Sequence, residues 1–153
     1  MAPQEFYGEL HRAAQSLAGA KLFTITVQDV TAGVVRRAYS SHPLDYPVSG
    51  TKPLQPDAWS RIVLEQGKTF IANSTAEFAP HFPDHALINR LGCHAAINVP
   101  VIEAGQVLGT VNVLDVAGHF TDARVAALTG LFAAHHAGLV SAMRATPMGP
   151  GLD

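Results

Sequence analysis

The chain has 153 residues, 48% of them hydrophobic and only 14% charged, which predicts one globular domain and excludes a disordered chain. The formal net charge is −2 and the ten Lys and Arg residues are scattered, so no basic patch indicates nucleic acid or an anionic membrane as a partner. The N-terminus lacks the apolar core of a signal peptide, no apolar run approaches the ~18 residues of a membrane span, and Cys93 is the single cysteine, so we expect a cytoplasmic protein without disulfides.

The first forty residues predict a helix followed by a β-hairpin. Apolar residues recur at intervals of three and four over residues 4–19, and Gly19 stands where a helix would end. Residues 22–30 alternate in polarity and are rich in β-branched side chains. A turn-prone segment and a second strand, residues 34–39, follow them.

The middle of the chain predicts covering loops and short elements. Residues 40–56 contain four prolines and are expected to form a loop. A helix is predicted over 56–67 and a short strand over 69–73. Residues 74–92 combine two prolines with a helical pattern, and we interpret them as a loop with one short helix.

The last third predicts a strong hairpin and a long helix. Residues 95–102 and 106–114 are strands joined through a glycine-containing turn. Thr121 is placed to cap one amphipathic helix over 121–143. Residues 146–153 are rich in Pro and Gly, and we expect a disordered tail after a single domain over 4–145. Hairpins at both ends favour the α+β class, with an antiparallel sheet and helices mainly on one face.

The C-terminal hairpin predicts two chemically different faces. Alternation along a strand places Ile97, Val99 and Val101 on one side. The opposite side collects polar residues from both strands, namely His94, Asn98, Thr110 and Asn112. Buried amides must be hydrogen-bonded, so they either bond to protein groups and ordered water or contact a ligand in a largely apolar pocket.

Aromatic residues of the covering segments extend this candidate site. Tyr46, Trp59 and Phe82 occur in the segments expected to lie over the polar face, and Asn73 ends the short strand beside it. Trp59 is open to two interpretations, as part of the core or as the wall of a cavity.

No catalytic or metal-binding motif is present. His81, Asp84, His85 and His94 lie within fourteen positions, but their spacing matches no closed ligand set and Pro83 interrupts the His81–His85 interval. Cys93 is expected to be a buried apolar residue. We therefore predict no catalytic residues and no metal, and the sequence identifies no cofactor.

Residues 91–114, LGCHAAINVPVIEAGQVLGTVNVL, resemble the corresponding segment of GAF domains, with a short apolar strand ending in Pro-Val and a Val-Leu-Gly-Thr strand. Residues 119–122 resemble the start of that family's last helix, although Arg124 replaces the usual acidic residue. The resemblance implies a profilin-like antiparallel sheet. The N- and C-terminal helices would lie on one face, and loops and short helices would enclose a pocket on the other.

The resemblance also limits the functional classes. GAF-type methionine-sulfoxide reductases use cysteine pairs, and this chain has one cysteine. Phytochrome-type GAF domains attach a bilin through a Cys-His at the place where this chain has Pro83 and Asp84. The expected function is a non-enzymatic sensor of an unidentified small molecule. Alternatives are an interaction module with a degenerate pocket, or an enzyme acting on a small substrate.

The same resemblance implies a homodimer formed through the first and last helices. The low charge of the chain agrees with a surface that is partly covered by a partner. Within the last helix, Ala126, Leu131 and Leu139 are the residues expected to face the second subunit.

Overall fold

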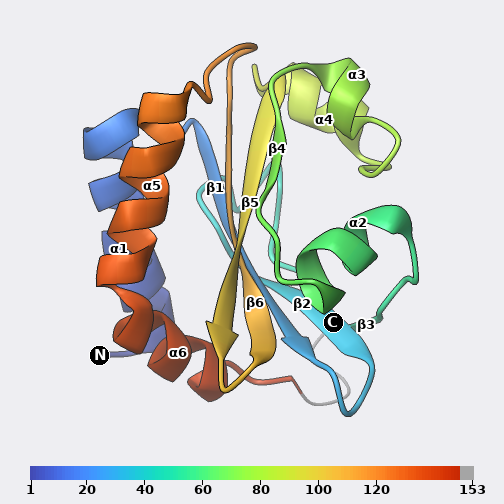
Figure 1. Ribbon diagram of the computed structural model, residues 1–153, viewed down its shortest axis with the longest axis vertical. Coiled ribbons are helices and arrows are strands. Elements are labelled where there is room, and N and C mark those ends of the chain that lie inside the picture. Colours follow the sequence, from blue (N-terminus) through green and yellow to red (C-terminus); the bar gives the residue numbers. More distant parts are fainter. Residues whose placement is uncertain (149–153) are drawn as a thin grey trace.

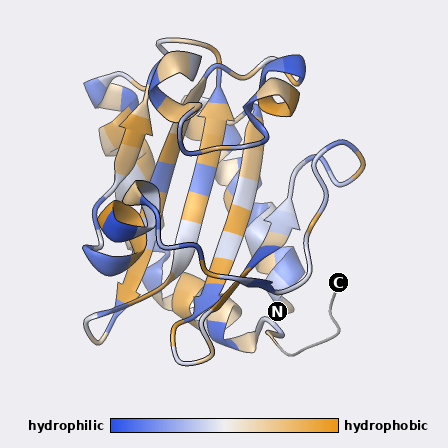
Figure 2. Ribbon diagram, turned by 90° about the vertical axis from the view of Figure 1, so that its right-hand side faces the viewer, coloured by the Kyte–Doolittle hydropathy of each residue, from blue (hydrophilic) through white to orange (hydrophobic). Residues whose placement is uncertain are grey.

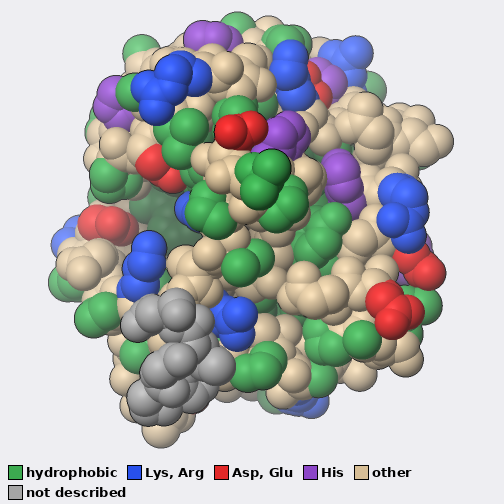
Figure 3. Space-filling model, turned by 180° about the vertical axis from the view of Figure 1, so that it is seen from behind, with side chains coloured by type: hydrophobic (Ala, Val, Ile, Leu, Met, Phe, Trp, Pro, Cys, Tyr) green, Lys and Arg blue, Asp and Glu red, His purple; other side chains and the backbone are tan. Residues whose placement is uncertain are grey.

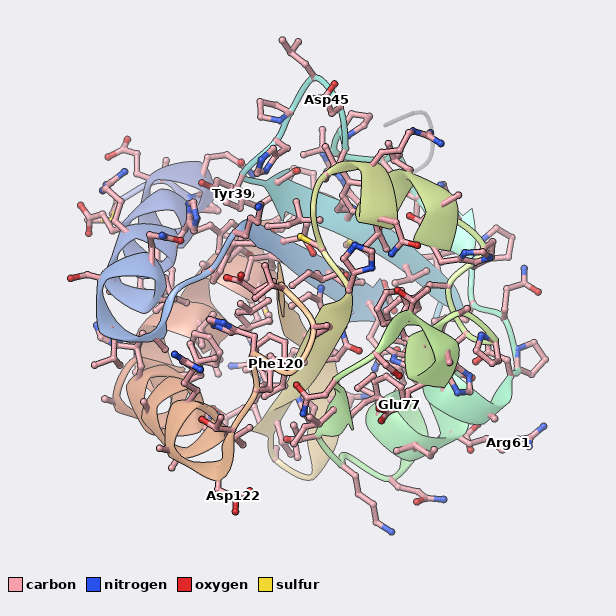
Figure 4. All side chains as sticks on the ribbon, turned by 90° about the horizontal axis from the view of Figure 1, so that it is seen from above. Tyr39, Asp45, Arg61, Glu77, Phe120 and Asp122 are labelled. Atoms are coloured by element: carbon pink, nitrogen blue, oxygen red, sulfur yellow. The ribbon has the colours of Figure 1, made fainter. Side chains whose placement is uncertain are left out.

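The computed structural model describes residues 1–148 and has three layers (Figure 1). Helices α1, α5 and α6 pack on one face of a central sheet, and the short helices α2, α3 and α4 lie on the other face. Figure 4, a view from above, shows the sheet between these two helical groups. This arrangement confirms the predicted α+β class and the placing of the first and last helices on one face.

The sheet has six strands in the order β3-β2-β1-β6-β5-β4, and every neighbouring pair is antiparallel. The strands are β1 Leu22–Asp29, β2 Val34–Ser40, β3 Lys52–Pro53, β4 Phe70–Ala72, β5 Ala95–Glu103 and β6 Gln106–Asp115. The two-residue edge strand β3 lies inside the segment that we predicted as loop. Pro53 has no backbone N–H to donate, which explains why this strand stays short and at the edge.

The β5–β6 hairpin turns through Ala104 and Gly105, both at positive φ (53° and 76°). Two successive residues at positive φ are what a tight hairpin turn requires, since this turn twists in the same sense as the strands. The predicted hairpin is therefore confirmed.

The helices are α1 Pro3–Ala18, α2 Ala58–Ser60, α3 Thr75–Phe78, α4 His85–Arg90, α5 Asp122–Ala134 and α6 His136–Ala145. A π-helical turn, η1 Arg61–Glu65, continues α2. Gly19 ends α1 at a φ of 80°, and the side chain of Thr121 caps α5, as predicted. Residues 74–92 form two short helices where we predicted one.

The single helix predicted over 121–143 is wrong, because the chain breaks at His135 and the axes of α5 and α6 differ by 67°. The backbone N–H of His135 is shared between the carbonyls of Leu131 and Phe132, which tightens the last turn of α5. Just beyond the break, Gly138 lets the ring of Phe6 approach the α6 backbone so closely that a Cβ would overlap it. The bend therefore lets α6 pack against α1.

The main core lies between the sheet and α1, α5 and α6. Ile97, Val99 and Val101 all belong to it, as the alternation predicted. Each such side chain contributes about 1.5–3 kcal/mol when it is fully buried. Leu139 is also in this core and only 1% exposed, so its predicted place on an intersubunit surface is wrong.

Within residues 1–148, no single helix is long and apolar enough to cross a membrane. Helices α5 and α6 pass that test only when taken together, by length and composition, despite the bend between them.

Residues 149–153 of the predicted tail lie outside the described residues. Thr146, which we assigned to the tail, is buried, and its hydroxyl lies 3.0 Å from the Tyr7 hydroxyl. This contact attaches the end of α6 to α1.

Candidate functional site

The second face of the sheet is only partly filled. A small apolar cluster that includes Phe78, Ile88, Cys93 and Leu114 packs between the sheet and α3 and α4. Figure 2 shows this face, where apolar and polar residues alternate along the central strands.

Beside this cluster lies a cavity of about 450 Å³. It is lined by Thr24, Thr26, Val35, Arg37, Tyr46, Lys52, Trp59, His81, Phe82, Pro83, Asp84, Ile88, Asn98, Asn112 and Leu114. Figure 3 shows a hollow at the left of its view, with hydrophobic side chains visible inside it and charged side chains around the rim. The size is within the ~300–1,000 Å³ of small-molecule sites.

A chain of side-chain hydrogen bonds crosses the floor of the cavity. Trp59 Nε1 donates to Asn98 Oδ1 over 3.0 Å, and Asn98 Nδ2 donates to Asn112 Oδ1 over 2.7 Å. Asn112 Nδ2 then donates to the hydroxyl oxygens of Thr24 and Thr26, over 3.1 and 3.0 Å. Asn98 and Asn112 are directly opposed on β5 and β6, and Thr24 is opposite Asn112 on β1.

The indole group sets the direction of this chain. An indole N–H can only donate, so it requires the oxygen of Asn98 at that position, and each later amide is oriented in turn. The two threonine oxygens are therefore acceptors. Each hydroxyl proton remains available to donate toward the cavity, since no hydrogen bond donated by either hydroxyl occurs within residues 1–148.

Trp59 is positioned by the short helix that carries it. Asp57 and Ser60 form a reciprocal capping box at the start of α2, so three residues suffice for a defined helical turn. The Trp59 ring also meets Phe82 edge-to-face, with centroids 6.4 Å apart. Trp59 is half-buried and forms a wall of the cavity, which decides between the two interpretations of this residue.

Arg37 enters the cavity because β2 contains a β-bulge. Tyr39 pairs with Ile25 but Arg37 pairs with Thr26, so Ala38 is the extra residue. Without the bulge, Arg37 would share the helix-covered face with Tyr39, two positions away. The bulge instead places Arg37 beside Thr26.

The Arg37 side chain connects two covering loops. Its guanidinium lies 3.7 Å from the centroid of the Tyr46 ring and donates to the carbonyl of Pro47 over 3.0 Å. It also lies 3.6 Å from a carboxylate oxygen of Asp84. Burial, more than any other influence, raises the pKa of Tyr46, so this phenol stays neutral.

The structure brings together five of the eight site residues proposed from the sequence, namely Tyr46, Trp59, Phe82, Asn98 and Asn112. The other three do not line the cavity. Asn73 bonds both backbone groups of Phe120 and anchors the loop before α5. His94 is exposed and contacts Thr75, while Thr110 is fully buried and its hydroxyl has no partner within the described residues.

Other lining residues were missed from the sequence, above all Thr24, Thr26 and Arg37. The alternation of β1 was a usable signal, because Thr24 and Thr26 both fall on the face opposite Phe23 and Ile25. No local pattern marks the bulge that redirects Arg37.

Within residues 1–148, no group of three or more His, Cys, Asp or Glu side chains is arranged to hold a metal ion. Cys93 is completely buried, and burial raises its pKa to about 11, so the thiol stays protonated near neutral pH. A protonated thiol is a poor nucleophile, which argues against Cys93 as a catalytic group.

Comparison with solved structures supports the same fold. A GAF domain/HD domain protein from Geobacter sulfurreducens is 21% identical, with a TM-score of 0.70 and coverage of 94% of this chain and 95% of that one. The GAF domain of a two-component sensor histidine kinase from Bacillus halodurans is 11% identical, with a TM-score of 0.71 and coverage of 90% and 92%.

The PixJ GAF domain of Thermosynechococcus elongatus, in its blue-light absorbing form, is 13% identical, with a TM-score of 0.65 and coverage of 93% and 85%. The fold thus occurs in sensory and signalling proteins. No curated protein matches the sequence. Residues 1–139 match the GAF domain family, and since this match spans most of the chain, the chain belongs to that family.

Proposed function

We propose that this GAF domain is a non-enzymatic sensor that binds a small molecule in the cavity between the sheet and its covering segments. The observation that carries the proposal is the oriented hydrogen-bond chain from Trp59 to Thr24 and Thr26, which lies on the floor of a cavity of ligand size. A few placed polar groups in a mostly apolar hollow are typical of small-molecule sites.

The covering segments offer a way to transmit binding. Trp59 holds α2 to the sheet through one hydrogen bond, and Arg37 holds two loops through Pro47 and Asp84. These covering segments can then adopt more than one arrangement. A ligand that contacts them would shift the equilibrium toward the arrangement that it binds more tightly, by as much as its two affinities differ.

The proposal includes a homodimer formed through the outer faces of α1 and α5, in the cytoplasm. Ala126, Gly130 and Ala133 lie exposed along α5, which carries no Asp, Glu, Lys or Arg after Arg124. The lone cysteine agrees with a reducing compartment.

Fluorescence of Trp59 tests the proposal, because it is the only tryptophan of the chain. We would screen cyclic nucleotides, amino acids, haem and central metabolites by thermal shift, then titrate hits while recording Trp59 emission. A true ligand at 100 times its Kd should add about 2.7 kcal/mol of stability and change the emission.

Thr26→Leu, which places extra carbon atoms in the cavity, should abolish both responses. Thr31→Leu, in the exposed β1–β2 turn, should leave them unchanged. If no compound class stabilises the protein or changes Trp59 emission, the cavity is not a sensor site. The alternative of an interaction module then stands.

A further inference from the structure

The polar groups at one end of the cavity are arranged to donate hydrogen bonds. Because Asn112 Nδ2 donates to Thr24 and Thr26, both hydroxyls can offer protons to a ligand. Hydroxyl donors at the floor favour a ligand that presents hydrogen-bond acceptors there.

Strand register places cations beside these donors. Thr26 and Arg37 are direct partners across β1 and β2, so their Cβ atoms are about 4.5–5.5 Å apart. On the next strand, Lys52 is paired with Val35, two positions from Arg37 on the same face. Arg37 and Lys52 each carry a positive charge at the cavity, and Asp84 is the one carboxylate among its lining residues.

The existing ion pair leaves Arg37 available. Its distance to Asp84 is 3.6 Å, and the two side chains are 26% and 36% exposed. Such a partly exposed pair contributes little stability, so a ligand acceptor can replace or share it at small cost. The Tyr46 ring, whose centroid lies 3.7 Å from the guanidinium carbon, helps to hold the guanidinium in place.

Apolar side chains form another part of the lining, which also includes His81. Trp59, Phe82, Ile88 and Leu114 make up this apolar part, with Trp59 and Phe82 meeting edge-to-face. This wall suits a ring or a compact hydrocarbon group.

We infer that the ligand is a small organic monocarboxylate with an apolar, ring-sized body, an inference that rests on the proposed function. Its carboxylate accepts from the Thr24 and Thr26 hydroxyls and from Arg37, with Lys52 at the rim, and its body lies against Trp59 and Phe82. Arg37 and Lys52 carry two positive charges and Asp84 carries one negative charge, so the lining has one net positive charge, which one carboxylate neutralises. A phosphate dianion would bring one negative charge more than the lining neutralises.

Three probes of the same shape test the inference: phenylacetate, phenylacetamide and 2-phenylethylamine. Each is titrated at neutral pH against the whole protein by Trp59 fluorescence and thermal shift. Phenylacetate should bind at least about tenfold more tightly than the neutral amide, because charge-assisted hydrogen bonds are the stronger ones, and the amine should not bind.

Arg37→Gln should reduce the preference for phenylacetate over phenylacetamide to about one. Arg12→Gln makes the same charge change at an exposed site on α1 and should leave the preference intact. Because Arg37 also holds two loops, Lys52→Gln at the exposed edge strand provides a second variant. It should weaken phenylacetate and not phenylacetamide.

Equal or tighter binding of the amide or the amine overturns the inference. So does a preference for phenylacetate that survives both Arg37→Gln and Lys52→Gln. If other compound classes change Trp59 emission and none of the three probes does, the carboxylate assignment fails and the sensor function stands. If nothing changes Trp59 emission, the proposed function itself fails.

Discussion

At the scale of single residues, one donor organises the polar floor of the cavity. Amide side chains can usually face either way, but the Trp59 indole removes that freedom for Asn98 and, through it, for Asn112. The effect reaches Thr24 and Thr26 on a strand more than eighty positions earlier in the chain. A residue on a short covering helix thereby sets which groups the sheet presents to the cavity.

Removing the hydroxyl group should change the free energy of unfolding in opposite directions at two threonines on the cavity-facing side of the sheet. Thr110 is fully buried with no partner for its hydroxyl within the described residues, so Thr110→Val removes a buried polar group and keeps the shape. We expect the free energy of unfolding to stay the same or to rise by up to about 1–2 kcal/mol. The matched variant Thr24→Val leaves an Asn112 N–H with one acceptor fewer and should lower it by about 1–3 kcal/mol.

Urea denaturation of both variants measures the difference. A larger loss for Thr110→Val than for Thr24→Val would contradict the assigned hydrogen-bond chain.

At the scale of elements, the sheet positions the site through close strand contacts and one irregularity. The bulge in β2 turns Arg37 into the cavity, and the β1–β6 pairing brings Thr24 beside Asn112. Both depend on how strands pair, so substitutions that shift β1 against β6 should damage the site even when they lie outside it.

Gly109 on β6 tests this dependence. A Cβ at Gly109 would overlap the carbonyl oxygen of Thr26 on β1, which is backbone and cannot rotate away. Gly109→Ala should therefore lower the free energy of unfolding by about 1–3 kcal/mol and alter Trp59 emission in the folded protein.

Gly8→Ala is the matched control, since the residue is helical, is buried away from the proposed dimer surface, and a Cβ there meets only the side chains of Arg12 and Tyr39 at ordinary contact distances of 3.6 and 3.7 Å. It should raise stability by up to about 1 kcal/mol, because Ala favours helix over Gly. Thermal and urea unfolding decide between these expectations. A neutral Gly109→Ala would show that the strands can separate locally without cost.

At the scale of the whole molecule, the two faces of the sheet serve different purposes. The main core fills the space between the sheet and α1, α5 and α6, while a cavity remains between the sheet and the other layer. In Figure 4, Asp45 and Arg61 point outward from the covering segments, so their charges lie outside the cavity. A change in the covering segments would reach the proposed dimer interface through the sheet and the layer formed by α1, α5 and α6.

The dimer proposal predicts twice the monomer mass at tens of micromolar in light scattering or sedimentation. Ala126→Glu places one charge from each subunit in the proposed interface, and each unpaired buried charge costs about 3–5 kcal/mol, so this variant should be a monomer with unchanged far-UV circular dichroism. Ala86→Glu, on exposed α4, should remain a dimer. A monomeric wild type, or a dimeric Ala126→Glu, rules out this interface.

Local periodicity was enough to predict the two-sided β5–β6 hairpin, with Val99 and Val101 toward the helices and Asn98 and Asn112 away from them. Successive side chains of any strand point to opposite faces of the sheet, so this alternation can be recognised from neighbouring residues alone. Apolar residues at intervals of three and four located the first helix in the same way, and the side chain of Thr121 marked the start of α5.

Only the tertiary structure decided which polar groups meet. Thr24, Thr26 and Arg37 join Asn112 because β1 pairs with both β2 and β6 and because β2 carries an extra residue. The packing of α6 against α1 likewise depends on the close contact between Gly138 and Phe6, which are far apart in the sequence. Distant segments meet because of strand register and close tertiary contacts. Neither of these produces a repeating pattern among neighbouring residues, so the sequence alone does not reveal them.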